Sequence, residues 1–244
     1  METFIRVVGF GEDGSKLVEN LRHVVRKGPF GEQTDYEQLD FMTFSNEECG
    51  RINESFSIEN SEKANSKLML LVIRVDGPAA SSVIPIFHRC AKITGWDLGV
   101  MMLRSEDSPD NGWPKWTDLP EGHCDFFTVL SANVNSSRSF NCIEGLISTL
   151  KNQGFIHVNY EDFKKILFDG GEVKFISCYA PQWCLKTPDE MNYCILQVLH
   201  APNFTMCQMQ KIANVLPNDI ECIINCQNIM EEGCPAIVNA WYKE

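Results

Sequence analysis

Four small residues near the N-terminus have the spacing of a phosphate-binding turn: Gly9, Gly11, Gly14 and Ser15. They follow an apolar segment and precede an amphipathic one, so the sequence predicts a strand, a glycine turn and the start of a helix. That arrangement normally directs free backbone N–H groups at a nucleotide phosphate. Here two carboxylates, Glu12 and Asp13, lie inside the turn. The turn therefore keeps the framework of a phosphate site. Its two carboxylates would repel the phosphate, however, because like charges repel.

A second glycine-rich loop, which an enclosed nucleotide requires, should follow a later strand. At that place the chain has Gly77-Pro78-Ala79-Ala80-Ser81-Ser82. Pro78 has no N–H to donate, and alanine adopts the positive φ of such loops only at a cost. Gly77, Ser81 and Ser82 remain compatible with a phosphate. Each lost charge-assisted contact is worth about 1.5–3 kcal/mol, so the loss of several removes binding at cellular concentrations.

The other reactive side chains do not form a site that the sequence identifies. None of the 11 cysteines belongs to a Cys-x-x-Cys pair, which disfavours a zinc ribbon or a redox pair. Cys222 and Cys226 share one face of an expected strand, where burial explains them and oxidation or a metal is the alternative. His123 and Cys124 are neighbours on a strand and point to opposite faces, so they cannot easily share a ligand site. We therefore predict no metal site.

Composition and charge disfavour several classes of partner. The chain has 244 residues and a net charge of −12, and no basic stripe gathers on a predicted face, so we do not expect a nucleic-acid partner. No apolar run approaches the roughly 20 residues of a membrane span. No signal-peptide pattern precedes the first strand, so we expect a cytoplasmic protein.

The elements that must position these residues alternate between strand and helix in the first half of the chain. Strands are predicted over residues 3–9, 38–44, 67–75, 96–103 and 124–131. Helices are predicted over residues 14–26, 81–93 and 140–151, the first of them burying Leu17, Val18, Leu21, Val24 and Val25. This alternation predicts an α/β fold with a doubly wound, mostly parallel sheet.

The second half is predicted to form a smaller mixed α/β domain. Helices are expected over residues 159–168, 188–199 and 206–215, and strands over residues 172–179, 219–225 and 236–241. The helix at residues 188–199 is predicted from the inward spacing of Met191, Ile195 and Leu199. The predicted domains are residues 1–136, a core helix with its connecting loop at residues 137–156, and residues 157–244.

The order of these elements resembles that of the tubulin/FtsZ family, and two segments carry the resemblance. Residues 5–15, Ile-Arg-Val-Val-Gly-Phe-Gly-Glu-Asp-Gly-Ser, are similar to the family's first strand and first nucleotide loop. Residues 154–166, Gly-Phe-Ile-His-Val-Asn-Tyr-Glu-Asp-Phe-Lys-Lys-Ile, resemble the loop that follows the core helix and reaches the neighbour's nucleotide in a filament. The resemblance implies a cytoskeletal protein with a GTPase-like domain, a long core helix and a smaller C-terminal domain, in a family with roles in cell division.

Departures from the family pattern concern the GTP site. The family's phosphate loop, Gly-Gly-Gly-Thr-Gly-Thr/Ser-Gly, is replaced here by residues 77–82, and the loop expected to wrap the γ-phosphate is shortened to residues 59–66. One C-terminal strand is also predicted to be absent, because only residues 201–203 separate the last two helices. We therefore predict a pseudo-GTPase that binds no cofactor, its GTP binding having been lost.

The family's catalytic loop is altered as well. The family uses an Asn and two acidic residues there to position the water that attacks GTP on the next subunit. By the register of the resemblance, His157 replaces the Asn and Asn159 replaces the first acid, whereas Asp162 remains. Asn159 can orient a water but cannot act as a base at neutral pH. These three residues are the candidates for catalysis, and we favour a protein without catalytic activity.

The resemblance and its departures together predict a protein that acts through protein–protein interaction. Its partner would be a polymerising member of the family, which it would regulate or cap, or a second copy of itself in a filament with weak or no GTPase activity. The expected contact residues lie in the preserved loop and beside a proline in an exposed loop: His157, Asn159, Glu161, Asp162, Trp113 and Trp116.

An NAD(P)-dependent oxidoreductase of Rossmann type is the alternative that the glycine spacing leaves open. In that interpretation Glu47 or Glu48, after the second strand, would hold the ribose hydroxyls. Glu12 and Asp13 oppose a pyrophosphate for the same reason that they oppose GTP.

Overall fold

The chain divides into two compact units. Unit 1 comprises Met1–Phe140 and Asp169–Glu172, and unit 2 comprises Asn141–Phe168 and Val173–Glu244. The computed structural model describes residues 3–25, 38–56, 64–75, 80–104, 122–133, 136–151, 158–168, 171–188 and 190–244. Each unit is built around a sheet of its own.

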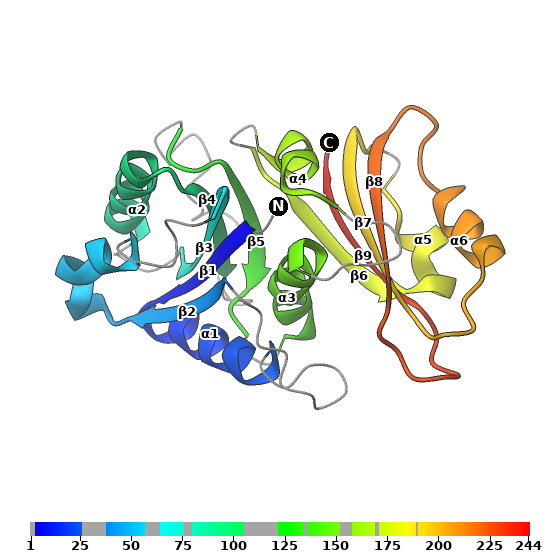
Figure 1. Ribbon diagram of the computed structural model, residues 1–244, viewed down its shortest axis with the longest axis horizontal. Helices are drawn as coiled ribbons and strands as arrows, with labels where there is room; N and C mark the ends of the chain where they lie inside the picture. Colours follow the sequence, from blue (N-terminus) through cyan, green and yellow to red (C-terminus); the bar gives the residue numbers. More distant parts are fainter. Residues whose placement is uncertain are drawn as a thin grey trace. The chain divides into compact units, whose positions relative to one another are not determined.

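Unit 1 contains a five-stranded parallel sheet in the order β2-β1-β3-β4-β5 (Figure 1). The strands are β1 (Thr3–Phe10), β2 (Leu39–Phe44), β3 (Ser66–Arg74), β4 (Asp97–Arg104) and β5 (Phe126–Ser131). Every residue of β1 is buried, and so are residues 68–73 of β3. Burial on both faces explains why the sequence has continuous apolar runs there instead of alternation. The predicted parallel sheet is confirmed.

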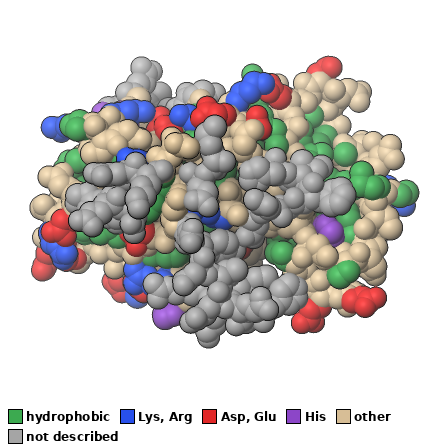
Figure 2. Space-filling view, in the orientation of Figure 1, with side chains coloured by type: hydrophobic (Ala, Val, Ile, Leu, Met, Phe, Trp, Pro, Cys, Tyr) green, Lys and Arg blue, Asp and Glu red, His purple; other side chains and the backbone are tan. Residues whose placement is uncertain are grey.

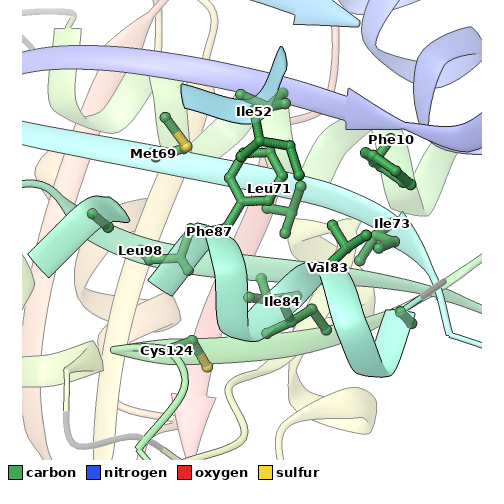
Figure 3. Packing of buried hydrophobic residues seen from close by; sticks show 14 of the residues in the cluster. Phe10, Ile52, Met69, Leu71, Ile73, Val83, Ile84, Phe87, Leu98 and Cys124 are labelled. Atoms are coloured by element: carbon green, nitrogen blue, oxygen red, sulfur yellow. The ribbon is translucent and has the colours of Figure 1, made fainter. Parts of the chain in front are cut away.

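Helices cover both faces of this sheet. They are α1 (Gly11–Val25), the 3-10 helix η1 (Asn46–Phe56) and α2 (Ala80–Thr94). α1 contacts β1, β2 and β3, whereas α2 contacts η1, β3 and β4. Figure 3 shows the core on the α2 side, where Val83, Ile84 and Phe87 lie in one cluster with Leu71 and Ile73 of β3. The doubly wound arrangement is therefore confirmed as well.

α1 begins earlier than predicted, at Gly11, so the glycine turn is the first turn of the helix itself. Gly11 permits this abrupt start because its φ of +73° lies in the left-handed region that favours glycine. Glu12 and Asp13 consequently lie on the helix and not in a loop. Val24, predicted to face the core, is 49% exposed, so the buried stripe of α1 ends at Leu21 among the described side chains.

Unit 2 contains a four-stranded mixed sheet in the order β6-β9-β7-β8 (Figure 1). The strands are β6 (Lys174–Tyr179), β7 (Tyr193–His200), β8 (Glu221–Asn228) and β9 (Ile237–Lys243). β7 and β8 are parallel, whereas β9 is antiparallel to both β6 and β7. The helical elements are α3 (Ser137–Lys151), which begins in unit 1, α4 (Tyr160–Leu167), η5 (Ala180–Gln182), α5 (Trp183–Lys186) and α6 (Met206–Ala213). The mixed α/β fold predicted for the second half is confirmed.

β7 corrects two predictions. It is a strand in the region that was predicted to be a helix over residues 188–199. The spacing of Met191, Ile195 and Leu199 fits a helix, but residues 194–199 are all buried in a strand that lies between β9 and β8. β7 also lies between α5 and α6, where the sequence predicted that a strand was absent. The helix of this region is α5, which precedes β7.

Polar side chains cross the middle of this sheet in one row. Ser177, Asn239, Gln197 and Asn225 are neighbours in register on the four strands. The Gln197 amide donates to Ser148 Oγ on α3 at 2.7 Å and accepts from Asn239 Nδ2 at 2.9 Å. These buried hydrogen bonds fix α3 on the sheet, because a polar group left unpaired in a core costs about 1–3 kcal/mol.

Candidate functional site

The glycine turn places the candidate site at the carboxyl ends of β1 and β3. The winding of unit 1 reverses between these two neighbouring strands. Doubly wound proteins bind their ligands at such a topological switch point, in the crevice outside the carboxyl ends of the strands. The first turn of α1 follows β1 directly, and Arg74 is the last residue of β3. These two segments therefore form the described part of the site.

The packing of α1 accounts for two of the three glycines. A Cβ at Gly9 would lie 2.5 Å from the carbonyl oxygen of Gly14, and a Cβ at Gly14 would lie 2.3 Å from the carbonyl oxygen of Val72. Real Cβ atoms do not approach so closely, so both positions need glycine for α1 to pack against the strands. The Ser15 hydroxyl lies 3.4 Å from the carbonyl oxygens of Gly9 and Phe44, inside the turn. The spacing is thus required by the fold even without a phosphate.

An ion pair spans the switch point. Arg74 Nη1 donates to Asp13 Oδ2 at 2.9 Å, which joins the end of β3 to the first turn of α1. The Asp13 side chain is 21% exposed and the Arg74 side chain 45%. Arg74 was not a candidate in the sequence, although a cation that ends a buried apolar strand is a signal that could have identified it. A guanidinium and a carboxylate of the protein itself are therefore paired at the place where a ligand would enter.

The second carboxylate of the turn faces outward. Glu12 is 79% exposed and pairs with Lys16, one helical turn later, at 2.5 Å. The hydrogen bond from Lys16 lowers the pKa of Glu12 below its ordinary value. Two carboxylates in the first turn also interact favourably with the positive end of the helix dipole. The charge that a bound anion would supply at this N-terminus is already provided by the protein.

The second loop of the predicted nucleotide site is described only in part. Ser81 and Ser82 are exposed in the first turn of α2, whereas Gly77 lies outside the described residues. The structure thus brings Gly9, Gly11, Gly14 and Ser15 together in one turn, and the participation of Gly77, Ser81 and Ser82 stays a prediction.

The predicted catalytic loop supplies the N-terminus of α4. Asn159 is the N-cap, and its Oδ1 accepts the backbone N–H of Asp162 at 2.8 Å. This cap explains an Asn at position 159 by itself, since N-cap side chains stabilise a helix by about 1 kcal/mol. Glu161 is exposed and Asp162 half-buried in the first turn of the helix. His157, like Trp113 and Trp116, lies outside the described residues.

Glu48, the candidate acid of the oxidoreductase alternative, has a local role. Its carboxylate accepts hydrogen bonds from the backbone N–H of Ser45 at 2.9 Å and from Ser45 Oγ at 3.0 Å. It also pairs with Arg51 at 2.6 Å. The hydrogen bonds from Ser45 lower the pKa of Glu48. Glu48 therefore stabilises the start of η1, while Glu47 is exposed beside it.

Thiols and imidazoles form no metal-binding cluster in the part of the chain that the structure describes. No group of three or more His, Cys, Asp or Glu side chains there could hold a metal ion, and the described cysteines form no disulfide with one another. Burial raises the pKa of Cys124 to about 12, which keeps this thiol protonated and unreactive. Cys226 is buried in the core of unit 2, and Cys222 packs against the same core, as their shared face predicted.

No family model matches the sequence, and no curated protein matches it. Among solved structures, the empty FtsZ dimer of M. jannaschii has a TM-score of 0.71 at 12% identity, over 100% of this chain and 89% of that chain. CetZ1 of Haloferax volcanii, a GDP-bound monomer, has a TM-score of 0.60 at 13% identity, over 99% of this chain and 93% of that one. TubZ of Bacillus thuringiensis serovar israelensis, in GDP-form protofilaments, has a TM-score of 0.61 at 11% identity, over 98% and 84%.

The chain has a tubulin/FtsZ-like fold. Because the likeness extends over nearly the whole chain, this fold includes unit 2 as well as unit 1. None of the described helices is long and apolar enough to cross a membrane. On the face shown in Figure 2, the acidic and basic side chains of the described residues are interspersed and do not gather in a basic stripe.

Proposed function

We propose that this protein is a tubulin/FtsZ-like protein that has lost GTP binding and acts through contacts with other proteins. The observation that carries the proposal is the ion pair between Asp13 and Arg74, because it joins the two sides of the switch point at the place where a phosphate would have to bind.

The residues at the switch point do not fit a triphosphate. Two like unit charges about 4 Å apart repel by about 4 kcal/mol at an effective dielectric constant of about 20, and a phosphate at this helix N-terminus would meet the carboxylate of Asp13. Arg74, which could otherwise attract the phosphate, is paired with Asp13. A nucleotide therefore has to break this ion pair before it can use the guanidinium.

Calorimetric titration with GTP and Mg²⁺ tests the loss of binding. We expect no heat beyond dilution, while CetZ1, which was solved with GDP, serves as the positive control with GDP. A dissociation constant below about 10 μM, roughly −7 kcal/mol, would refute the proposal. NADH and NADPH in the same instrument test the oxidoreductase alternative, which the local role of Glu48 does not support.

The proposed partner is a second tubulin-like subunit in the cytoplasm, either a polymerising relative or another copy of this chain. FtsZ was solved as a dimer and TubZ as protofilaments, which supports a partner of this kind. On this chain the start of α4 offers the exposed side chains of Asn159 and Glu161 as a contact surface.

A charge reversal at α4 tests this contact by sedimentation velocity, with the protein alone and with purified FtsZ or TubZ. We expect Glu161→Lys to weaken association at least about tenfold, because it reverses a charge at the contact. Glu232→Lys makes the same charge change at another exposed position of unit 2 and should have no effect. Association that survives both Glu161→Lys and His157→Ala would assign the contact to another surface, such as that of Trp113 and Trp116.

A further inference from the structure

Unit 2 contains a cavity that is lined by none of the residues predicted to form a site. Its volume is about 580 Å³, and it is lined by residues of η5, α5 and α6, of the segments on either side of α6 and of the segment before β9. Cavities of about 300–1,000 Å³ with mostly apolar walls are the usual size of small-molecule sites. This cavity is therefore large enough for a drug-sized ligand.

The apolar walls are held in place by contacts of their own. The indole Nε1 of Trp183 donates to the carbonyl oxygen of Ile212 at 3.1 Å, which ties α5 to α6. The ring of Phe204 stacks on His200 with 4.7 Å between the ring centroids. Pre-organised walls of this kind lower the entropic cost of binding an apolar group.

The charge that the described lining of the cavity carries is positive. Among the described residues that line it, Lys211 is the only charged one, in a chain whose net charge is −12. Gln208 also lines the cavity, but its Oε1 accepts hydrogen bonds from the N–H and Oγ of Thr205 in the cap of α6. What Gln208 offers to a ligand is therefore its NH₂ donor. An ammonium and an amide donor beside apolar walls complement an apolar molecule with an anionic end.

We propose that this cavity binds a small amphiphilic carboxylate, with its apolar body against Phe204 and Val215 and its carboxylate at Lys211. The inference does not depend on the state of the GTP site, since every residue that carries it lies in unit 2.

Displacement of anilinonaphthalene sulfonate fluorescence by decanoate and by decanol tests the class of ligand. Decanoate should displace the dye from the native protein at lower concentration than decanol, because only decanoate has the carboxylate. Lys211→Gln should weaken decanoate about tenfold and leave decanol unchanged. Lys186→Gln is the matched control, since Lys186 is on α5 but does not line the cavity. Equal binding of the two probes, or unchanged decanoate binding in Lys211→Gln, would overturn the proposal.

The protection of thiols from alkylation tests whether the ligand binds in this cavity. Cys184 and Cys234 line the cavity, whereas Cys207 does not, and all three are exposed and free. Decanoate should slow the alkylation of Cys184 and Cys234 by iodoacetamide and leave Cys207 at its original rate. Equal slowing at the three thiols, or no slowing at any, would overturn the assignment. Protection by an acidic apolar peptide but not by decanoate would assign the cavity to a protein partner instead and would likewise overturn it.

Discussion

Removal of the charge on Asp13 should convert the switch point into a weak anion site. Asp13→Asn keeps the size of the side chain but removes the carboxylate that accepts from Arg74 Nη1 at 2.9 Å. The guanidinium and the N–H groups in the first turn of α1 would then both attract an incoming phosphate. In the wild type the same phosphate meets the carboxylate of Asp13.

The size of the effect follows from the geometry. Two unit charges about 4 Å apart interact by about 1 kcal/mol in water and by about 4 kcal/mol near a protein surface. The side chains of Asp13 and Arg74 are 21% and 45% exposed, so solvent screens this site and we take the lower part of that range, about 1–2 kcal/mol. The affinity for an anion should therefore rise about fivefold to thirtyfold in Asp13→Asn.

An NMR titration with pyrophosphate measures this change at the site itself, through the chemical shifts of the backbone amides of residues 11–14. Glu12→Gln is the matched control, because it removes a carboxylate from the same turn whose side chain is 79% exposed and paired with Lys16. If both variants gained the same affinity, net charge rather than the ion pair would be responsible. That result, or unshifted amides in Asp13→Asn, would refute the reasoning.

The fold follows from local pattern where apolar runs alternate with amphipathic helices. The run at residues 67–75 predicts a strand covered on both faces, and β3 is buried in that way. The pattern misled at β7 because the spacing of Ile195 and Leu199 fits a helix and because Gln197 interrupts the apolar run. The partners that satisfy Gln197 lie on α3 and β9, so the segment alone contains no sign that a buried amide belongs there.

Only those features of the candidate site that lie within one short segment could be predicted from the sequence. The glycines lie within one turn, and the cap at Asn159 has a local signal in the acidic Asp162 three residues later. The pairing of Asp13 with Arg74 joins residues 61 positions apart and depends on β1 and β3 being neighbours in the sheet. Strand order is a property of the whole domain, because it is set by how the helices cover the sheet. The sequence can mark Arg74 as a cation at the end of a buried strand, but its pairing with Asp13 has to come from the structure.

Two further sets of substitutions test the buried hydrogen bonds of Gln197 in β7 and the titration of Glu144 in α3. Gln197→Met keeps the side-chain volume but removes the hydrogen bonds to Ser148 Oγ and from Asn239 Nδ2. At about 1–3 kcal/mol for each group left unpaired, urea unfolding should show a loss of about 2–5 kcal/mol, whereas Gln210→Met, at an exposed position of α6, should cost less than about 0.5 kcal/mol. On α3, burial raises the pKa of Glu144 to about 7. A carboxyl group whose pKa is raised by folding contributes stability that is complete below its unfolded pKa, about 4.3, and is lost as the pH rises through its folded pKa. The whole shift is worth roughly 3–4 kcal/mol, and because Glu144 keeps part of its surface exposed, we expect the wild type to lose about 1–3 kcal/mol between about pH 5 and pH 8. Glu144→Gln cannot titrate, so its free energy of unfolding should depend less on pH by that amount, while the exposed Glu232→Gln follows the wild type. Parallel pH profiles of the wild type and Glu144→Gln would contradict the raised pKa, because a carboxyl group that folding perturbs must change the pH dependence when it is removed.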